Sequence, residues 1–207
     1  MKLQFAMDTL TTEAALELAA AAAPYVDILE LGTPLIKSAG LSAVTAIKAA
    51  HPDKIVFADL KTMDAGELEA DTAFAAGADL VTVLGASGDS TIIGAVKAAK
   101  KHGKGVVVDL IGVTDKAARA KQVIAFGVEF VEMHAGLDEQ AEKGFTFDTL
   151  LRDGEASGVP FSVAGGINVS TIASVQKSGA LVAVAGGAIY GAPDVGAAAA
   201  ALRAAII

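Results

Sequence analysis

The sequence predicts a single α/β domain built as a (β/α)8, or TIM, barrel with minimal loops. Three observations predict this fold class. Short apolar runs alternate with alanine-rich stretches along all 207 residues. The runs recur at the spacing of one strand–helix unit, which is the signature of repeated βα modules. No Pro- or Ser-rich linker divides the chain, so we expect residues 1–207 to form one domain.

Eight runs are interpreted as strands because they are apolar on both faces, as strands covered on both sides are. In order they are Leu3–Met7, Val26–Leu31, Ile55–Leu60, Leu80–Leu84, Val106–Leu110, Val128–His134, Phe161–Ala164 and Leu181–Ala185. The alternative is an open doubly wound sheet. Such a sheet usually carries a G-x-G-x-x-G turn after its first strand, whereas this first strand runs into Asp8-Thr9.

The intervening segments carry helix signals. Thr11-Thr12-Glu13 opens the first helix with a cap followed by a good helix former, and Asp115 can cap the segment through Phe126. Four helices are followed by a glycine just before the next strand, where a left-handed residue commonly ends a helix. These glycines are Gly77, Gly103, Gly127 and Gly179.

Composition excludes several function classes. Acidic residues number 24 and basic residues 16, which gives a net charge of −8 and argues against nucleic-acid or membrane partners. The absence of cysteine excludes disulfides, zinc–thiolate sites and a cysteine nucleophile. Mean hydropathy is +0.54, but charges, Gly or Pro interrupt every apolar stretch, and no signal-peptide pattern opens the chain. We therefore expect a cytoplasmic location.

Ionisable residues gather at the carboxyl ends of the predicted strands, where barrel active sites lie. They are Asp8, Glu30, Asp59 with Lys61 and Asp64, Asp109, and His134 with Asp138. Chance would scatter such residues along the strands, so we interpret them as one site. Strand periodicity places Asp59 and Lys61 on the same side.

Paired glycines follow the last two strands. Gly165-Gly166 and Gly186-Gly187 stand where barrel loops commonly bind phosphate through backbone N–H groups. Glycine also ends strands for turn reasons, but two pairs at equivalent positions favour a phosphate site.

Carboxylates at these strand ends predict a divalent metal. Glu30, Asp59 and Asp8 offer hard oxygen ligands, which suit Mg²⁺ or Mn²⁺. For Glu30 the plainer alternative is a salt bridge to Lys61. Lys61 itself is either a cation held between Asp59 and Asp64 or a Schiff-base lysine, and the flanking carboxylates favour the first.

His134 ends an apolar strand and is the natural general acid or base near pH 7. Asp109 and Asp138 are candidate supports, and Glu132 shares its side of the strand. The alternative is a histidine whose role is confined to the core.

These motifs resemble those of a known family. Asp59-Leu60-Lys61-Thr62-Met63-Asp64 matches the D-x-K-x-x-D motif of the orotidine 5′-phosphate decarboxylase superfamily, and "ILELGTPLI" is similar to a segment of its sugar-phosphate branch. "HAGLDEQ" resembles the 3-hexulose-6-phosphate synthases of that branch. The 3-keto-L-gulonate 6-phosphate decarboxylases usually carry an arginine shortly after this histidine, where this chain has Leu137.

The resemblance implies a reaction and roles. The synthases condense D-ribulose 5-phosphate with formaldehyde, reversibly, to D-arabino-hex-3-ulose 6-phosphate through an Mg²⁺-stabilised 1,2-enediolate. The resemblance implies that Glu30 and Asp59 hold the metal and that Asp8 lies near the substrate hydroxyls. It further implies that Lys61 stabilises the enediolate oxygen and that His134 moves the C1 proton. It also implies phosphate binding by the glycine pairs and a homodimer in which Asp64 reaches the neighbouring site. The decarboxylase activity is the alternative; an epimerase or a silent sugar-phosphate-binding protein fits the residues less well.

Overall fold

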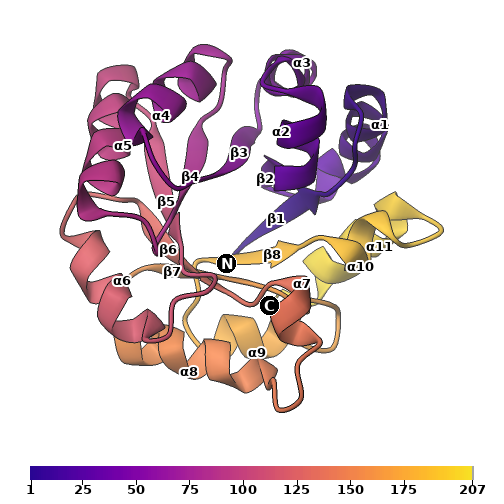
Figure 1. Cartoon of the computed structure of the whole chain (residues 1–207). Helices are drawn as coiled ribbons and strands as arrows, with labels where there is room; N and C mark the ends of the chain where they lie inside the picture. The colour runs from indigo at the N-terminus through magenta and orange to yellow at the C-terminus, as the bar shows by residue number, and fades with distance from the viewer. Residues whose placement is uncertain (207) are drawn as a thin grey trace.

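The computed structural model describes residues 1–206, and in that range eight parallel strands form a closed barrel in the order β1 to β8. The strands are β1 (Lys2–Met7), β2 (Ile28–Leu31), β3 (Ile55–Thr62), β4 (Leu80–Leu84), β5 (Gly105–Asp109), β6 (Phe130–His134), β7 (Phe161–Ala164) and β8 (Val182–Ala185). β1 pairs with both β2 and β8, which closes the ring (Figure 1). The predicted barrel is therefore confirmed.

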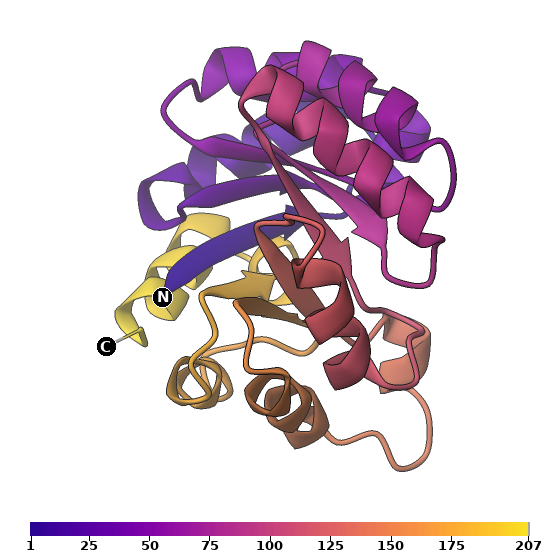
Figure 2. The same ribbon diagram turned by 90° about the vertical axis from the view of Figure 1, so that its left-hand side faces the viewer.

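The helices form the outer layer. They are α1 (Thr12–Ala22), η1 (Ala23–Tyr25), α2 (Thr33–Ala39), α3 (Ser42–Ala50), α4 (Gly66–Ala75), α5 (Asp89–His102), α6 (Lys116–Ile124), α7 (Leu137–Gln140), α8 (Phe147–Ser157), α9 (Ile172–Lys177), α10 (Gly187–Tyr190) and α11 (Val195–Ala204). Figure 2 shows α5 and α6 lying in front of the strands. Within residues 1–206, two α-helices rather than one lie between β2 and β3, between β6 and β7, and after β8.

Local signals in the sequence act as predicted. The side chains of Thr11 and Asp115 accept N–H bonds at the starts of α1 and α6. The four glycines that precede strands all have positive φ, between 65° and 108°. They end helices in the left-handed conformation, which costs glycine little.

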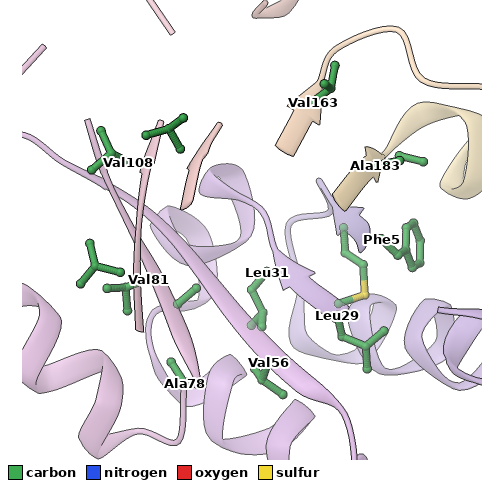
Figure 3. Close-up of a cluster of buried hydrophobic side chains, with 14 of the residues drawn as sticks. Phe5, Leu29, Leu31, Val56, Ala78, Val81, Val108, Val163 and Ala183 are labelled. Carbon is green, nitrogen blue, oxygen red and sulfur yellow. The ribbon is translucent and has the colours of Figure 1, made fainter. Parts of the chain in front are cut away.

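Each strand sends alternate side chains to opposite sides of the barrel wall. One large apolar cluster lies between the strands and the helices (Figure 3). Its members include Leu3, Phe5 and Met7 of β1 and Leu29 and Leu31 of β2. A smaller cluster of Ile28, Phe57, Val107, Phe130, Ala164, Val182 and Val184 fills a second core region. Three members of this smaller cluster are followed, two positions later on the same face of their strand, by an acidic residue. The pairs are Ile28 with Glu30, Val107 with Asp109, and Phe130 with Glu132.

Strand boundaries differ from the prediction by up to two residues: β2 and β6 each begin two residues later than predicted, and β3 ends two residues later. This strand extends to Thr62, and its pairing with β4 shifts register between Ala58 and Thr62. Over residues 1–206, none of the helices has both the length and the apolar character needed to cross a membrane.

Candidate functional site

A cavity of about 640 Å³ lies at the carboxyl ends of the strands. The cavity is lined by five of the predicted ionisable residues, which are Asp8, Glu30, Asp59, Lys61 and His134. The glycine pairs after β7 and β8 line it as well: Gly165, Gly166, Gly186 and Gly187. The structure thus brings together most of the site residues expected from the sequence.

The β3 end is not a regular strand. Ala58 pairs with Val81 and Thr62 with Val83, so Asp59, Leu60 and Lys61 stand opposite Thr82 alone. Lys61 has φ +46°, a left-handed conformation that costs a non-glycine residue about 1–3 kcal/mol. Asp59 and Lys61 do share the cavity, but through this bulge rather than through the two-residue period from which we predicted it.

Lys61 is held by two carboxylates, and only one of them was anticipated. Its Nζ lies 3.1 Å from Asp59 Oδ2 and 2.6 Å from Asp109 Oδ2. Burial alone would lower the pKa of Lys61, but Asp59, Asp109 and Glu132 raise it above its usual range. The predicted partner Asp64 is exposed and lies outside the residues lining the cavity. A raised pKa also opposes the Schiff-base alternative, which requires a depressed one.

His134 contacts the same aspartate. Its Nδ1 lies 2.9 Å from Asp109 Oδ2 and 3.5 Å from Glu132 Oε1. Burial opposes protonation of His134, yet the neighbouring Asp109 and Glu132 raise its pKa. Asp109 is fully buried, and its pKa is held low by His134 and Lys61 against the effect of burial. Burial and nearby Asp109 raise the pKa of Glu132 to about 7.

Of the two predicted supports for His134, the structure places only Asp109 beside it. Asp138 is exposed on α7 and does not line the cavity. The helix turns it outward, while Gln140 on the same helix lines the cavity and donates to Ala135 O.

Glu30 lies beside β1 rather than in a salt bridge with Lys61. Its Oε2 accepts a 2.7 Å hydrogen bond from Gln4 Nε2, and both residues are buried. Burial raises the pKa of Glu30 well above its usual range, and nearby Asp59 and Glu132 add to this. Asp8 has a raised pKa for the same reasons, burial first and Asp59 second.

Asp59 is oriented by hydroxyl groups that we did not single out from the sequence. Thr33 Oγ1 donates to Asp59 Oδ2 at 2.5 Å and Thr82 Oγ1 to Oδ1 at 2.7 Å. The Thr33 position lies in the "ELGTP" segment used for the family resemblance. Thr82 is a single threonine in an apolar strand and carries no distinguishing signal in the sequence.

Carboxylates outnumber cations in this region. Four carboxylates line the cavity, namely those of Asp8, Glu30, Asp59 and Glu132, and Asp109 adjoins Lys61 and His134. One atom from each of Asp109, Glu132 and His134 lies within 4.8 Å of the other two, close enough to hold a metal ion. Oxygen donors in excess of positive charge fit a hard divalent cation.

The glycine pairs allow close approach to the cavity. Gly165 and Gly166 have φ of +104° and +74°, which other residues adopt only with strain. Gly187 begins the short helix α10, and Tyr190 at the end of that helix also lines the cavity. Residues of two neighbouring loops thus border the cavity beside β7 and β8.

The chain is similar to known proteins over nearly its whole length. The family described as "Orotidine 5'-phosphate decarboxylase / HUMPS family" matches residues 1–202. A 3-hexulose-6-phosphate synthase from Mycobacterium gastri is 72% identical over 206 residues, which cover 100% of both chains. A crystal structure of a 3-hexulose-6-phosphate synthase, 72% identical, superimposes with a TM-score of 0.99 over 100% of both chains. A 3-keto-L-gulonate-6-phosphate decarboxylase from Vibrio cholerae is 32% identical, with a TM-score of 0.87 over 99% of this chain and 96% of that one. The chain therefore belongs to the orotidine 5′-phosphate decarboxylase / HUMPS family.

Proposed function

We propose that this chain is a lyase that condenses D-ribulose 5-phosphate with formaldehyde to D-arabino-hex-3-ulose 6-phosphate, reversibly, as in formaldehyde fixation by the ribulose monophosphate pathway. The full-length 72% identity to a 3-hexulose-6-phosphate synthase carries this proposal. The decarboxylase alternative is not favoured, because the decarboxylase structure described above is only 32% identical. Leu137 stands where the decarboxylases usually have arginine.

The charged side chain of Lys61 fits the chemistry of this reaction. Removal of a proton from C1 of the substrate, next to the C2 carbonyl, places negative charge on the carbonyl oxygen. Lys61, kept charged by Asp59 and Asp109, would stabilise that oxygen as the charge develops. The resulting enediolate attacks the formaldehyde carbon through C1, and the new alkoxide takes up a proton.

His134 would move these protons. Its Nδ1 is engaged by Asp109, which leaves Nε2 as the nitrogen available to the substrate. A negative Asp109 strengthens the basicity of the ring and holds its orientation. Asp8 would contact substrate hydroxyls from the end of β1.

Glu30 and Asp59 would hold Mg²⁺ or Mn²⁺, since both carboxylates line the cavity. When bound, the ion supplies positive charge next to the oxygen on which negative charge develops. The phosphate would bind at the two glycine pairs. Local cation and N–H groups would thereby attract an anionic substrate to a chain whose net charge is −8.

We also propose a homodimer in which Asp64 reaches the neighbouring site. Asp64 is exposed, as are the adjacent Met63 in the chain and Leu68 in the first turn of α4, which are 57% and 67% exposed. Large apolar side chains exposed next to a motif aspartate favour coverage by a second copy.

The test is consumption of formaldehyde with D-ribulose 5-phosphate in the presence of Mg²⁺. We expect turnover by the native chain, loss with His134→Ala and normal turnover with His51→Ala, a histidine in the loop before β3. Release of CO₂ from 3-keto-L-gulonate 6-phosphate without formaldehyde consumption would support the decarboxylase instead.

A further inference from the structure

We propose that Thr82 is a positioning residue that holds Asp59 and Lys61 in their active arrangement through one hydroxyl group. The inference rests on the proposed function for its kinetic test and on the β3–β4 geometry for everything else.

The bulge in β3 removes ladder partners from the residues it displaces. Three residues, Asp59 to Lys61, face Thr82 alone, between the pairs Ala58–Val81 and Thr62–Val83. Backbone N–H groups in such a bulge need a partner from elsewhere.

The Thr82 side chain provides this partner. Lys61 N donates to Thr82 Oγ1 at 2.8 Å, and the same hydroxyl donates to Asp59 Oδ1 at 2.7 Å. One atom therefore fixes the backbone of Lys61 and the carboxylate of Asp59 together. Thr82 is 1% exposed, so solvent does not readily replace the hydroxyl.

The backbone of Lys61 makes this restraint necessary. With φ at +46°, Lys61 occupies a conformation that a lysine leaves unless the surroundings hold it. The ammonium group of Lys61 lies between Asp59 and Asp109 while the backbone of Lys61 keeps its left-handed conformation. Thr82 is not among the residues lining the cavity, so it acts through Asp59 and Lys61 rather than on the substrate.

Thr82→Val tests the proposal, because valine keeps the β-branched shape and removes only the hydroxyl chemistry. We expect kcat to fall by about 10- to 100-fold, as for other groups that orient site residues. KM for D-ribulose 5-phosphate should change by less than about 3-fold, since the proposed phosphate loops follow β7 and β8, across the barrel. Thr82→Ser restores the hydroxyl and should recover most of kcat.

Matched variants separate positioning from packing. Thr91→Val alters another buried threonine, on α5 outside the cavity, and should leave both constants unchanged. Thr82→Ala removes the same two hydrogen bonds and is measured alongside Thr82→Val, with the melting temperature of each variant. Native kcat in Thr82→Val or Thr82→Ala would overturn the proposal, as would a Thr82→Ser variant as impaired as Thr82→Val.

A crystal structure of Thr82→Val distinguishes failure of this inference from failure of the proposed function. We expect Lys61 to leave the left-handed region and its Nζ to move away from Asp109. An unchanged Lys61 overturns the positioning role whatever the reaction is. A displaced Lys61 in an enzyme whose native form consumes no formaldehyde supports the positioning role and rejects the proposed reaction.

Discussion

Asp109 Oδ2 accepts a 2.6 Å hydrogen bond from Lys61 Nζ, although the two residues are 48 positions apart in the chain. β5 carries Asp109 and the bulged end of β3 carries Lys61, and only β4 lies between these strands in the barrel. The same carboxylate oxygen contacts His134 Nδ1. A single buried anion thus keeps a cation and an imidazole in the cavity wall at fixed positions.

Asp109→Asn removes this shared charge. Burial lowers the pKa of His134, and the charge of Asp109 is the largest effect that raises this pKa. The variant should therefore show a lower His134 pKa. Titration of the His134 ring by NMR measures the change, and kcat should fall by about 100-fold because ring orientation and basicity are both lost. Asp148→Asn, exposed on α8, is the control. An unaltered His134 pKa would show that Asp109 does not govern this histidine.

The barrel was predictable because its signals are local. Eight apolar runs, the caps at Thr11 and Asp115 and the glycines before strands each reflect a backbone preference that neighbouring residues decide. The paired helices between β2 and β3 were not predicted, because no strong breaker other than Gly40 separates α2 from α3.

Site geometry was less predictable because it depends on the pairing of distant strands. Sequence proximity suggested Asp64 as a partner of Lys61, but the chain turns outward after the β3 bulge and Asp109 takes that position. The two-residue period of a regular strand also did not predict the bulge in β3, because it already placed Asp59 and Lys61 on the same side. Thr82 acquires its role only because the register of β3 on β4 shifts beside it.

Glu30→Gln tests the metal assignment. Glutamine keeps the shape of the side chain and its contact with Gln4 but removes the negative charge, so Mn²⁺ affinity should fall by more than about 10-fold. Calorimetric titration measures binding directly, independent of turnover. EDTA should abolish formaldehyde consumption by the native chain, and added Mg²⁺ should restore it. Glu129→Gln, an exposed residue just before β6, should bind Mn²⁺ normally; equal affinity in both variants would exclude Glu30 as a ligand.

Asp79 provides a test of stability at the other end of the barrel. It pairs with Lys104 at 2.5 Å and Lys48 at 2.8 Å and accepts the N–H of Val56. Burial alone would raise its pKa, but these partners lower it below the usual 3.8. A depressed folded pKa stabilises the protein above the unfolded pKa, and this contribution is lost as pH falls through the folded value.

Asp79→Asn should therefore lower the free energy of unfolding at pH 7 by about 1–3 kcal/mol, with the smaller value favoured by partial solvent screening. The difference from the native chain should shrink in urea titrations at pH 3. Asp53→Asn, an exposed residue in the loop before β3, should match the native chain at both pH values. A destabilisation by Asp79→Asn that persists unchanged in acid would attribute the effect to packing instead of charge.

Mixing two inactive variants tests whether Asp64 serves the neighbouring site. Lys61→Ala removes the ammonium from a subunit's own cavity, and Asp64→Asn removes the carboxylate proposed to cross the interface. In a mixed dimer, the subunit that carries the Asp64→Asn change keeps its own Lys61 and receives Asp64 from its partner, so one of two sites is complete. Random reassortment makes about half of the dimers mixed, which predicts about a quarter of native activity per site. If Asp64 acted within its own subunit, or the chain were a monomer, every site would lack one group and mixing would restore nothing.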